Sequence, residues 1–197
     1  MTDAAAAAPG LDPEAAPLLL DLAVDGIRRA LLTGRRESPD VASLPAALQA
    51  PGATFVTLRR GERLLGCIGS LVAYQPLGVD VVVHGCNAAF DDPRMPPIDV
   101  DDFCAMSVHV SVLGPLRRLD VGSYPETVAM LRPGVDGALV ESAGRRGTLL
   151  PSVWAQLPTS EQFVEALWRK AGLRPGAWSA GTRVSVYSVA ECTDPGP

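Results

Sequence analysis

Residues 104–113 alternate between apolar and polar side chains more strictly than any other part of the chain. The apolar set comprises Met106, Val108, Val110 and Val112, and the polar set comprises Ser107, His109 and Ser111. Because side chains of a strand point to alternate faces, this pattern predicts a strand with one buried and one open face. Such strands are typical of antiparallel sheets, since parallel sheets are normally covered on both faces. We expect the open face to be solvated, or covered by another lobe, rather than to be a site.

The remaining segments predict several helices and further short strands. Helical spacing and end signals, including the capping boxes at Ser123 and Thr159, predict helices at residues 12–34, 45–50, 77–90, 125–131 and 159–172. Apolar β-type runs predict strands at residues 53–60, 63–71, 135–141, 148–150 and 183–190. Short turns between the strands favour antiparallel pairing, so the predicted fold class is α+β rather than a doubly wound parallel sheet.

The segment of residues 64–71 places Cys67 between Gly66 and Gly69, on the return strand of a predicted hairpin. Glycine weakens an ordinary strand but allows a neighbouring backbone or a ligand to approach closely. Cys67 therefore has two interpretations. Its thiolate could be a nucleophile, with amides of residues 68–70 forming an oxyanion hole or anion-binding nest. Alternatively, it is a small buried apolar residue, because free cysteine is among the most buried residue types.

The loop of residues 91–97 follows the predicted helix of residues 77–90 and contains three prolines and two adjacent aspartates. These residues predict an extended loop at the surface. Asp92 and Arg94 flank Pro93 and could line a site as an acid–base or ligand-orienting pair. Alternatively, both are structural, with Asp92 capping a turn and Arg94 pairing with an acidic neighbour. We favour this second interpretation. The candidate ligand-binding residues are Gly66, Ile68, Gly69, Ser70, Asp92 and Arg94.

The charge of the chain argues against a nucleic-acid partner. The formal net charge is −5, the chain contains a single lysine, Lys170, and its arginines lie in scattered pairs. Non-specific binding to nucleic acid depends on clustered basic side chains that contact phosphates. We therefore expect neither DNA nor RNA to be the partner.

No run of apolar residues approaches the ~20 needed to span a bilayer, and residues 1–13 lack the basic start of a signal peptide. We expect these residues to form a disordered leader and the protein to be cytoplasmic. The four cysteines, Cys67, Cys86, Cys104 and Cys192, form no Cys-x-x-Cys pair, and the chain has only two histidines. The spacing of a zinc site is therefore absent, and we predict no metal site and no cofactor.

Residues 64–70, Leu-Leu-Gly-Cys-Ile-Gly-Ser, resemble the Leu-Arg-Gly-Cys-Ile-Gly signature of the AMMECR-type domain, called AmmeMemoRadiSam system protein A in prokaryotes. Residues 88–97, Ala-Ala-Phe-Asp-Asp-Pro-Arg-Met-Pro-Pro, are similar to the family's Ala-Ala-Phe-x-Asp-Pro-Arg-Phe-Pro-Pro. Further matches follow in the family's order at residues 110–113, 131–137, 150–154 and 169–173. Several ordered motifs are more specific than any one of them.

The resemblance implies one domain of two lobes over residues 14–192, with a tail at residues 193–197. The larger lobe would contain both termini and a mainly antiparallel sheet, and a cleft would separate it from a smaller inserted lobe. No reaction is established for the family, which tends to occur with a Memo-type protein and a radical SAM protein. Our first hypothesis is a protein that binds a small molecule in the cleft, with Cys67 as the candidate catalytic residue. The alternative is a non-catalytic scaffold that docks these partners.

The chain departs from the family pattern at several positions. Leu65 replaces the signature arginine, so any anion that this arginine binds would lose that contact here. Met95 replaces a phenylalanine, and Asp91 stands where the family usually has arginine or another polar residue. Neither His84 nor His109 stands where the family has a histidine. A protease-like pair between Cys67 and a histidine is therefore a weak hypothesis.

Overall fold

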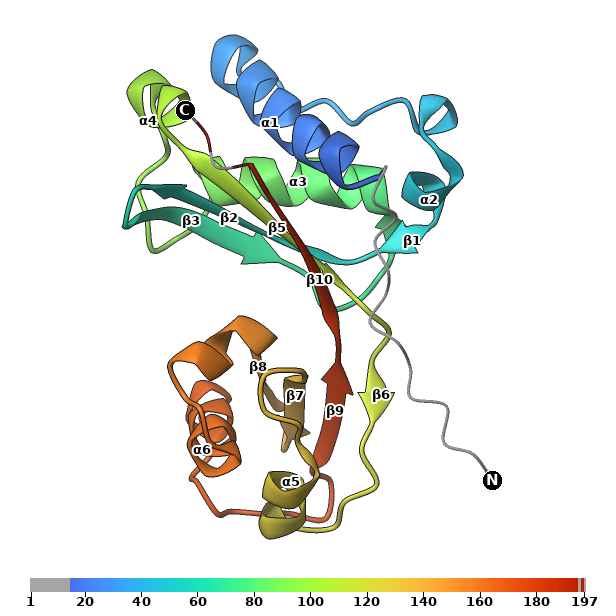
Figure 1. Ribbon diagram of the computed structural model, residues 1–197, viewed down its shortest axis with the longest axis vertical. Coiled ribbons are helices and arrows are strands. Elements are labelled where there is room, and N and C mark those ends of the chain that lie inside the picture. The colour runs from blue at the N-terminus through green and yellow to red at the C-terminus, as the bar shows by residue number, and fades with distance from the viewer. Residues whose placement is uncertain (1–14, 195, 197) are drawn as a thin grey trace. The chain divides into compact units, whose positions relative to one another are not determined.

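The computed structural model describes residues 15–194 and 196, so the predicted leader at residues 1–13 lies outside the described residues. The chain divides into two compact units. The large unit comprises described residues 15–113, 190–194 and 196, and the small unit comprises residues 114–189. Figure 1 labels the helices and strands of both units.

The large unit is built on a four-stranded sheet in the order β10-β5-β2-β3. Its strands are β2 (Thr54–Arg60), β3 (Arg63–Gly69), β5 (Ser107–Leu113) and β10 (Val189–Asp194). β2 pairs antiparallel with both β3 and β5, which leaves β3 at an edge of the sheet. β10 is separate from β9, so residues 183–190, predicted as one strand, belong to two strands in two different sheets.

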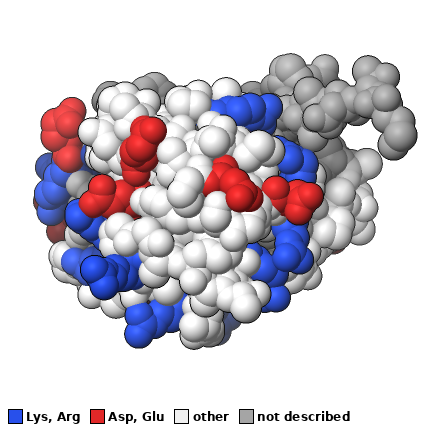
Figure 2. Space-filling view, turned by 90° about the horizontal axis from the view of Figure 1, so that it is seen from below, with Lys and Arg blue, Asp and Glu red and all other residues white. Residues whose placement is uncertain are grey.

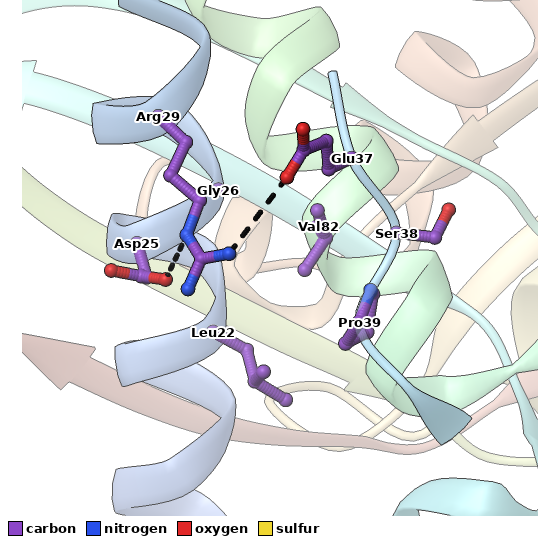
Figure 3. Close-up of a pocket in the computed structure, with 8 residues that line it drawn as sticks. All are labelled: Leu22, Asp25, Gly26, Arg29, Glu37, Ser38, Pro39 and Val82. Carbon is purple, nitrogen blue, oxygen red and sulfur yellow. Dashed lines mark ion pairs between the residues drawn. The ribbon is translucent and has the colours of Figure 1, made fainter. Parts of the chain in front are cut away.

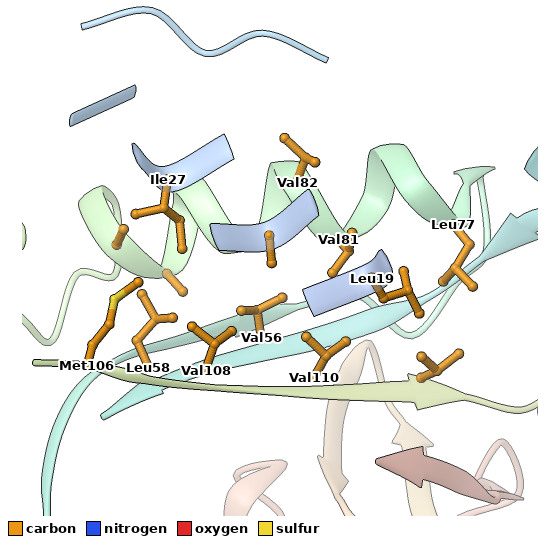
Figure 4. Close-up of a cluster of buried hydrophobic side chains, with 14 of the residues drawn as sticks. Leu19, Ile27, Val56, Leu58, Leu77, Val81, Val82, Met106, Val108 and Val110 are labelled. Atoms are coloured by element: carbon orange, nitrogen blue, oxygen red, sulfur yellow. The ribbon is translucent and has the colours of Figure 1, made fainter. Parts of the chain in front are cut away.

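Helices α1 (Ala15–Thr33) and α3 (Leu77–Phe90) pack on one face of this sheet. Figure 4 shows apolar side chains of β2 and β5 pointing toward these two helices. The predicted alternation is confirmed, since Val108 and Val110 are buried whereas His109 is only half-buried. The shorter elements of this unit are η1 (Val41–Ser43), α2 (Ala46–Gln49), β1 (Pro51–Gly52), β4 (Gln75–Pro76) and α4 (Val100–Cys104).

The small unit contains a second antiparallel sheet, in the order β6-β9-β7-β8. Its elements are β6 (Arg117–Arg118), α5 (Tyr124–Met130), β7 (Gly137–Ser142), β8 (Arg145–Leu149), η2 (Pro151–Ala155), α6 (Ser160–Lys170) and β9 (Arg183–Tyr187). The hydroxyl groups of Ser123 and Thr159 accept hydrogen bonds from the N–H groups of Glu126 and Gln162, both at 3.3 Å. Both predicted helix starts are thereby confirmed.

The core of the small unit is aromatic. The rings of Trp154 and Phe163 stack with their centroids 3.9 Å apart, and Trp168 meets Tyr124 edge-to-face at 5.0 Å. Trp168 is completely buried in this core. Together the two units confirm the predicted α+β fold class. None of the described helices combines the length and the apolarity needed to cross a membrane.

Candidate functional site

Cys67 lies on β3, and its backbone is held by the loop that follows α3. Its N–H group donates a hydrogen bond to Asp92 Oδ2 at 2.9 Å, and its carbonyl oxygen accepts one from Arg94 Nη2 at 2.9 Å. Both bonds are made on the side of β3 that faces away from β2, where an edge strand has unpaired backbone groups. The loop therefore provides hydrogen-bonding partners for the N–H and carbonyl groups of Cys67 at the edge of the sheet.

Asp92 and Arg94 form a bidentate ion pair. Arg94 Nε lies 2.8 Å from Asp92 Oδ1, and Arg94 Nη2 lies 2.6 Å from Asp92 Oδ2. The side chain of Asp92 is 1% exposed, whereas that of Arg94 is 58% exposed. The Arg94 guanidinium, together with the N–H groups of Cys67 and Arg94, holds the pKa of Asp92 well below its usual range, although burial acts in the opposite direction. The pair thus fixes a surface cation beside Cys67.

The two glycines of the signature are required by close packing. A Cβ atom on Gly66 would lie 1.9 Å from the carbonyl oxygen of Ala88 in α3, and one on Gly69 would lie 2.4 Å from Cγ of Phe55. Real atoms do not approach so closely, so a side chain at either position would displace its neighbour. The close approach expected from the sequence is confirmed. The approaching groups are the backbone of α3 at Gly66, and the backbone of Thr54 with the side chain of Phe55 at Gly69.

The thiol of Cys67 lies on the open face of the sheet, opposite the helices. Its Sγ accepts a hydrogen bond from the Thr57 hydroxyl at 3.3 Å, and the residue is half-buried. Thr57 is paired in register with Cys67 on one side and with His109 on the other. Two strand spacings of about 4.8 Å therefore separate the backbones of Cys67 and His109. His109 instead contacts Thr193, at 3.0 Å between Nδ1 and Oγ1.

The backbone amides of residues 68–70 point in alternate directions. Ser70 N–H donates to the carbonyl oxygen of Thr54 at 3.0 Å. Since the backbone groups of Cys67 point away from β2, strand alternation directs those of Ile68 toward β2 and those of Gly69 away from it. The amide of Gly69 is therefore the one of these three that faces the edge of the sheet.

The sequence motifs and the fold can be compared with those of known proteins. The family model AMMECR1 matches residues 20–192. The chain belongs to the AMMECR1 family. A protein of Methanothermobacter thermautotrophicus is 37% identical over 133 residues, covering 67% of this chain and 69% of its own length. Protein PF1979 of Pyrococcus furiosus is 35% identical over 167 residues, covering 81% of this chain and 78% of its own.

The crystal structure of uncharacterized protein PH0010 from Pyrococcus horikoshii is similar to this AMMECR1-family chain, with a TM-score of 0.85 and 31% sequence identity. The similarity covers 93% of this chain and 95% of that one. The predicted family is therefore confirmed, and the predicted fold is supported by a solved relative.

A second polar group of this AMMECR1-family protein lies on the helix-covered side of the sheet. His84 Nδ1 lies 3.0 Å from Oδ2 of Asp80, and both residues are buried. The sequence analysis considered His84 only as a partner for Cys67 and missed Asp80. The available signal was the spacing of four residues, which places both side chains on one face of the predicted helix.

Figure 3 shows a pocket between α1, α3 and residues 37–39, lined by none of the predicted site residues. Arg29 crosses it, paired with Asp25 at 2.7 Å and with Glu37 at 3.9 Å. Its volume is about 80 Å³, whereas ligand sites usually measure roughly 300 Å³ or more. The pocket is therefore smaller than a usual site for a small molecule. No group of three or more metal-binding side chains occurs within the described residues.

Proposed function

We propose that this AMMECR1-family protein binds a small molecule beside Cys67 and works with Memo-type and radical SAM partners. The observation that carries the proposal is the ion pair of Asp92 and Arg94, which fixes a guanidinium at the edge of β3 next to a half-buried thiol. All the contacts that support it lie within the large unit. The cleft between lobes stays a prediction.

The free donors of Arg94 favour an anionic ligand. Its Nε and Nη2 atoms are engaged by Asp92 and by the carbonyl of Cys67, whereas Nη1 forms no hydrogen bond with a described residue. Guanidinium N–H groups bind carboxylate and phosphate oxygens strongly. Leu65, which replaces the family's arginine, is buried in the apolar core and offers no charge. Arg94 is therefore the cation that we assign to the ligand.

Reactivity and protection of the thiol test this proposal. We expect iodoacetamide to label Cys67 at pH 7 faster than it labels the same cysteine in the urea-unfolded chain. Phosphate or a small dicarboxylate that binds beside it should slow the labelling. Cys104 is the control, because it is an exposed free cysteine that is not among the candidate site residues. Labelling no faster than in the unfolded chain would exclude a nucleophilic Cys67, and no protection by either anion would contradict an anion site.

Thermal stabilisation separates the role of the cation from that of the thiol. A ligand at about 100 times its Kd adds about 2.7 kcal/mol to the free energy of unfolding. We expect Arg94→Gln and Cys67→Ser each to reduce the stabilisation by the bound anion, whereas Cys104→Ser should leave it unchanged. Comparing each variant with and without the anion removes any effect of the substitution on stability itself.

A non-catalytic scaffold is the second candidate. Val72 and Tyr74, in the loop that follows β3, are 56% and 63% exposed. Tyrosine is enriched at protein interfaces, and neighbouring exposed apolar side chains can form part of such a surface. A scaffold should bind a Memo-type or radical SAM partner equally well after Cys67→Ser but more weakly after Tyr74→Ser.

Nucleic acid is not the partner that we propose. The net charge is −5, and on the face shown in Figure 2 acidic side chains stand among the basic ones. A surface of mixed sign does not provide the continuous basic patch that phosphate contacts require.

A further inference from the structure

Asp80 is a completely buried carboxylate with four hydrogen-bonding partners. Its Oδ2 accepts hydrogen bonds from the backbone N–H of Thr54 at 2.8 Å and from the Thr54 hydroxyl at 2.7 Å. The Oδ1 atom accepts one from Nε2 of Gln75 at 2.9 Å, and Nδ1 of His84 lies 3.0 Å from Oδ2. Burial by itself would raise the pKa of Asp80, but the hydrogen bonds from His84, Gln75 and Thr54 outweigh it and lower the pKa. Asp80 is therefore an ionised group.

This environment determines which nitrogen of His84 carries the proton. An ionised carboxylate only accepts hydrogen bonds, so Nδ1 must be the protonated nitrogen of the neutral ring. The lone pair then resides on Nε2, at the opposite side of the imidazole. The carboxylate also stabilises the positive charge that the ring acquires when Nε2 takes up a proton.

The Nε2 atom has no partner among the described residues, although His84 is only 5% exposed. Every completely buried side-chain nitrogen and oxygen of the described residues has a hydrogen-bonding partner. Within this part of the chain, Nε2 is therefore not completely enclosed, although the side chain of His84 is only 6% exposed. A histidine with a purely structural role would be expected to satisfy both ring nitrogens.

The contacts of α3 indicate which flank of the helix carries His84. α3 packs against α1 around Gly85, where a Cβ atom would contact Ile27, and against β3 at Ala88, beside Gly66. Helical geometry places Asp80 and His84 on the flank turned away from α1, toward the edge strand β3. The thiol of Cys67 points to the opposite face of the sheet, so the two sites are separate.

We propose that Asp80 and His84 form the proton-transfer dyad of a second site, which acts on a water molecule or a small hydroxyl compound that reaches Nε2. In this step the O–H bond breaks, an N–H bond forms at Nε2, and the electron pair stays on the oxygen. Asp80 is a positioning residue that keeps the proton on Nδ1 and stabilises the imidazolium. His84 is the residue that takes up the proton.

Hydrolysis of p-nitrophenyl acetate tests the base directly in the full chain. The background is Cys67→Ser with His109→Gln, which leaves His84 as the only imidazole and removes the candidate nucleophile. Nε2 takes one proton from water, the hydroxide attacks the ester carbonyl, and p-nitrophenolate leaves. The acetic acid and the imidazolium then each release a proton, which gives acetate and restores the neutral ring. We expect His84→Gln to abolish the hydrolysis above the buffer rate and Asp80→Asn to lower it about tenfold or more. Asp40→Asn is the matched control, because it makes the same substitution at an exposed aspartate outside the dyad and should leave the hydrolysis unchanged.

Nuclear magnetic resonance of the ring nitrogens provides a second readout that does not depend on the substitution of Asp80. In the His109→Gln variant, the proposal requires a protonated Nδ1 and an unprotonated Nε2 in the neutral ring. Hydrolysis unaffected by His84→Gln, or a proton on Nε2 of the neutral ring, would overturn the proposal. Neither result would bear on the site at Cys67, which lies on the other face of the sheet.

Discussion

The two units differ in the kinds of side chain that they contain. All four cysteines and both histidines of the chain belong to the large unit, whereas all three tryptophans belong to the small unit. The large unit has a mainly aliphatic core, whereas the core of the small unit contains stacked aromatic rings. The groups that can react or transfer a proton are thus concentrated in one unit, while the other is stabilised mainly by packing.

A buried aspartate of each unit serves a different purpose. In the large unit, the carboxylate of Asp92 binds the backbone of a distant strand at Cys67. In the small unit, the carboxylate of Asp136 binds the backbone and side chain of Arg132, four residues away. The carboxylate of Asp92 holds two distant segments of the candidate site together. The carboxylate of Asp136 stabilises only the turn to which it belongs.

The largest effect that we expect comes from Trp168 in the small unit. Trp168→Ala should lower the free energy of unfolding by about 3–5 kcal/mol, because a completely buried ring is removed. Urea unfolding measures the loss, and hydrogen exchange locates it. Exchange should accelerate over residues 114–189 and stay slow in the large unit. Trp178→Ala is the control and should cost less, since that ring is only half-buried. Equal acceleration in both units would show that they unfold together.

A smaller effect is expected from Asp92 in the large unit. Asp92→Asn should cost about 2 kcal/mol at neutral pH, because charge-assisted hydrogen bonds to Arg94 and to the Cys67 N–H are weakened. The pKa of folded Asp92 lies below the value of about 3.9 in an unfolded chain. Its contribution is therefore complete above about pH 4 and is lost as the pH falls below that value.

Urea unfolding as a function of pH checks this prediction. The wild type should lose stability more steeply than Asp92→Asn below about pH 4. Asp40→Asn is a suitable control, because Asp40 is an exposed aspartate that caps a single turn. If the free energy of unfolding fell equally steeply with pH in the wild type and in Asp92→Asn, the assigned role of the carboxylate would be contradicted.

The smallest effect is expected at Tyr187 in the small unit, and it occurs at the other end of the pH scale. Tyr187→Phe removes hydrogen bonds to Thr148 at 2.6 Å and to the carbonyl oxygen of Leu149 at 3.1 Å, at a cost of about 1 kcal/mol. Burial raises the pKa of Tyr187 to about 12, although the hydrogen bond with Thr148 acts against this. In an unfolded chain tyrosine titrates near about 10.

The stabilising contribution of the neutral phenol is thus complete below about pH 10 and is lost as the pH rises through about 12. The free energy of unfolding of the wild type should decrease over this pH range, and that of Tyr187→Phe should decrease less steeply with pH. Tyr74→Phe serves as the control, since Tyr74 is largely exposed. An identical alkaline dependence in the wild type and Tyr187→Phe would rule out this tyrosine as its cause.

Local features of the fold could be predicted from the sequence because they depend on neighbouring residues. The bounds of α3, the capping residues Ser123 and Thr159, and the alternation of β5 all follow from periodicity or short spacing. The division between β9 and β10 could not be predicted, since residues 183–190 read as one continuous strand and only tertiary pairing separates them.

The candidate site was only partly accessible from the sequence. The motif indicated Cys67, Asp92 and Arg94, but the hydrogen bonds between them join residues 25 and 27 positions apart. The same holds for Asp80, which contacts Thr54 from 26 positions away. Such partners depend on which strand forms the edge of the sheet, and spacing along the chain does not contain that information.

The hydrogen bonds from Asp92 and Arg94 to the backbone of Cys67 have a consequence for association between molecules. β3 is an outermost strand, and outermost strands can pair with a strand of another molecule. A strand of another molecule that paired with β3 would have to bond to the N–H and carbonyl groups of Cys67, which Asp92 and Arg94 already occupy. The loop of residues 91–97, which positions the guanidinium, therefore also hinders the addition of a strand from another molecule and the aggregation that this would start.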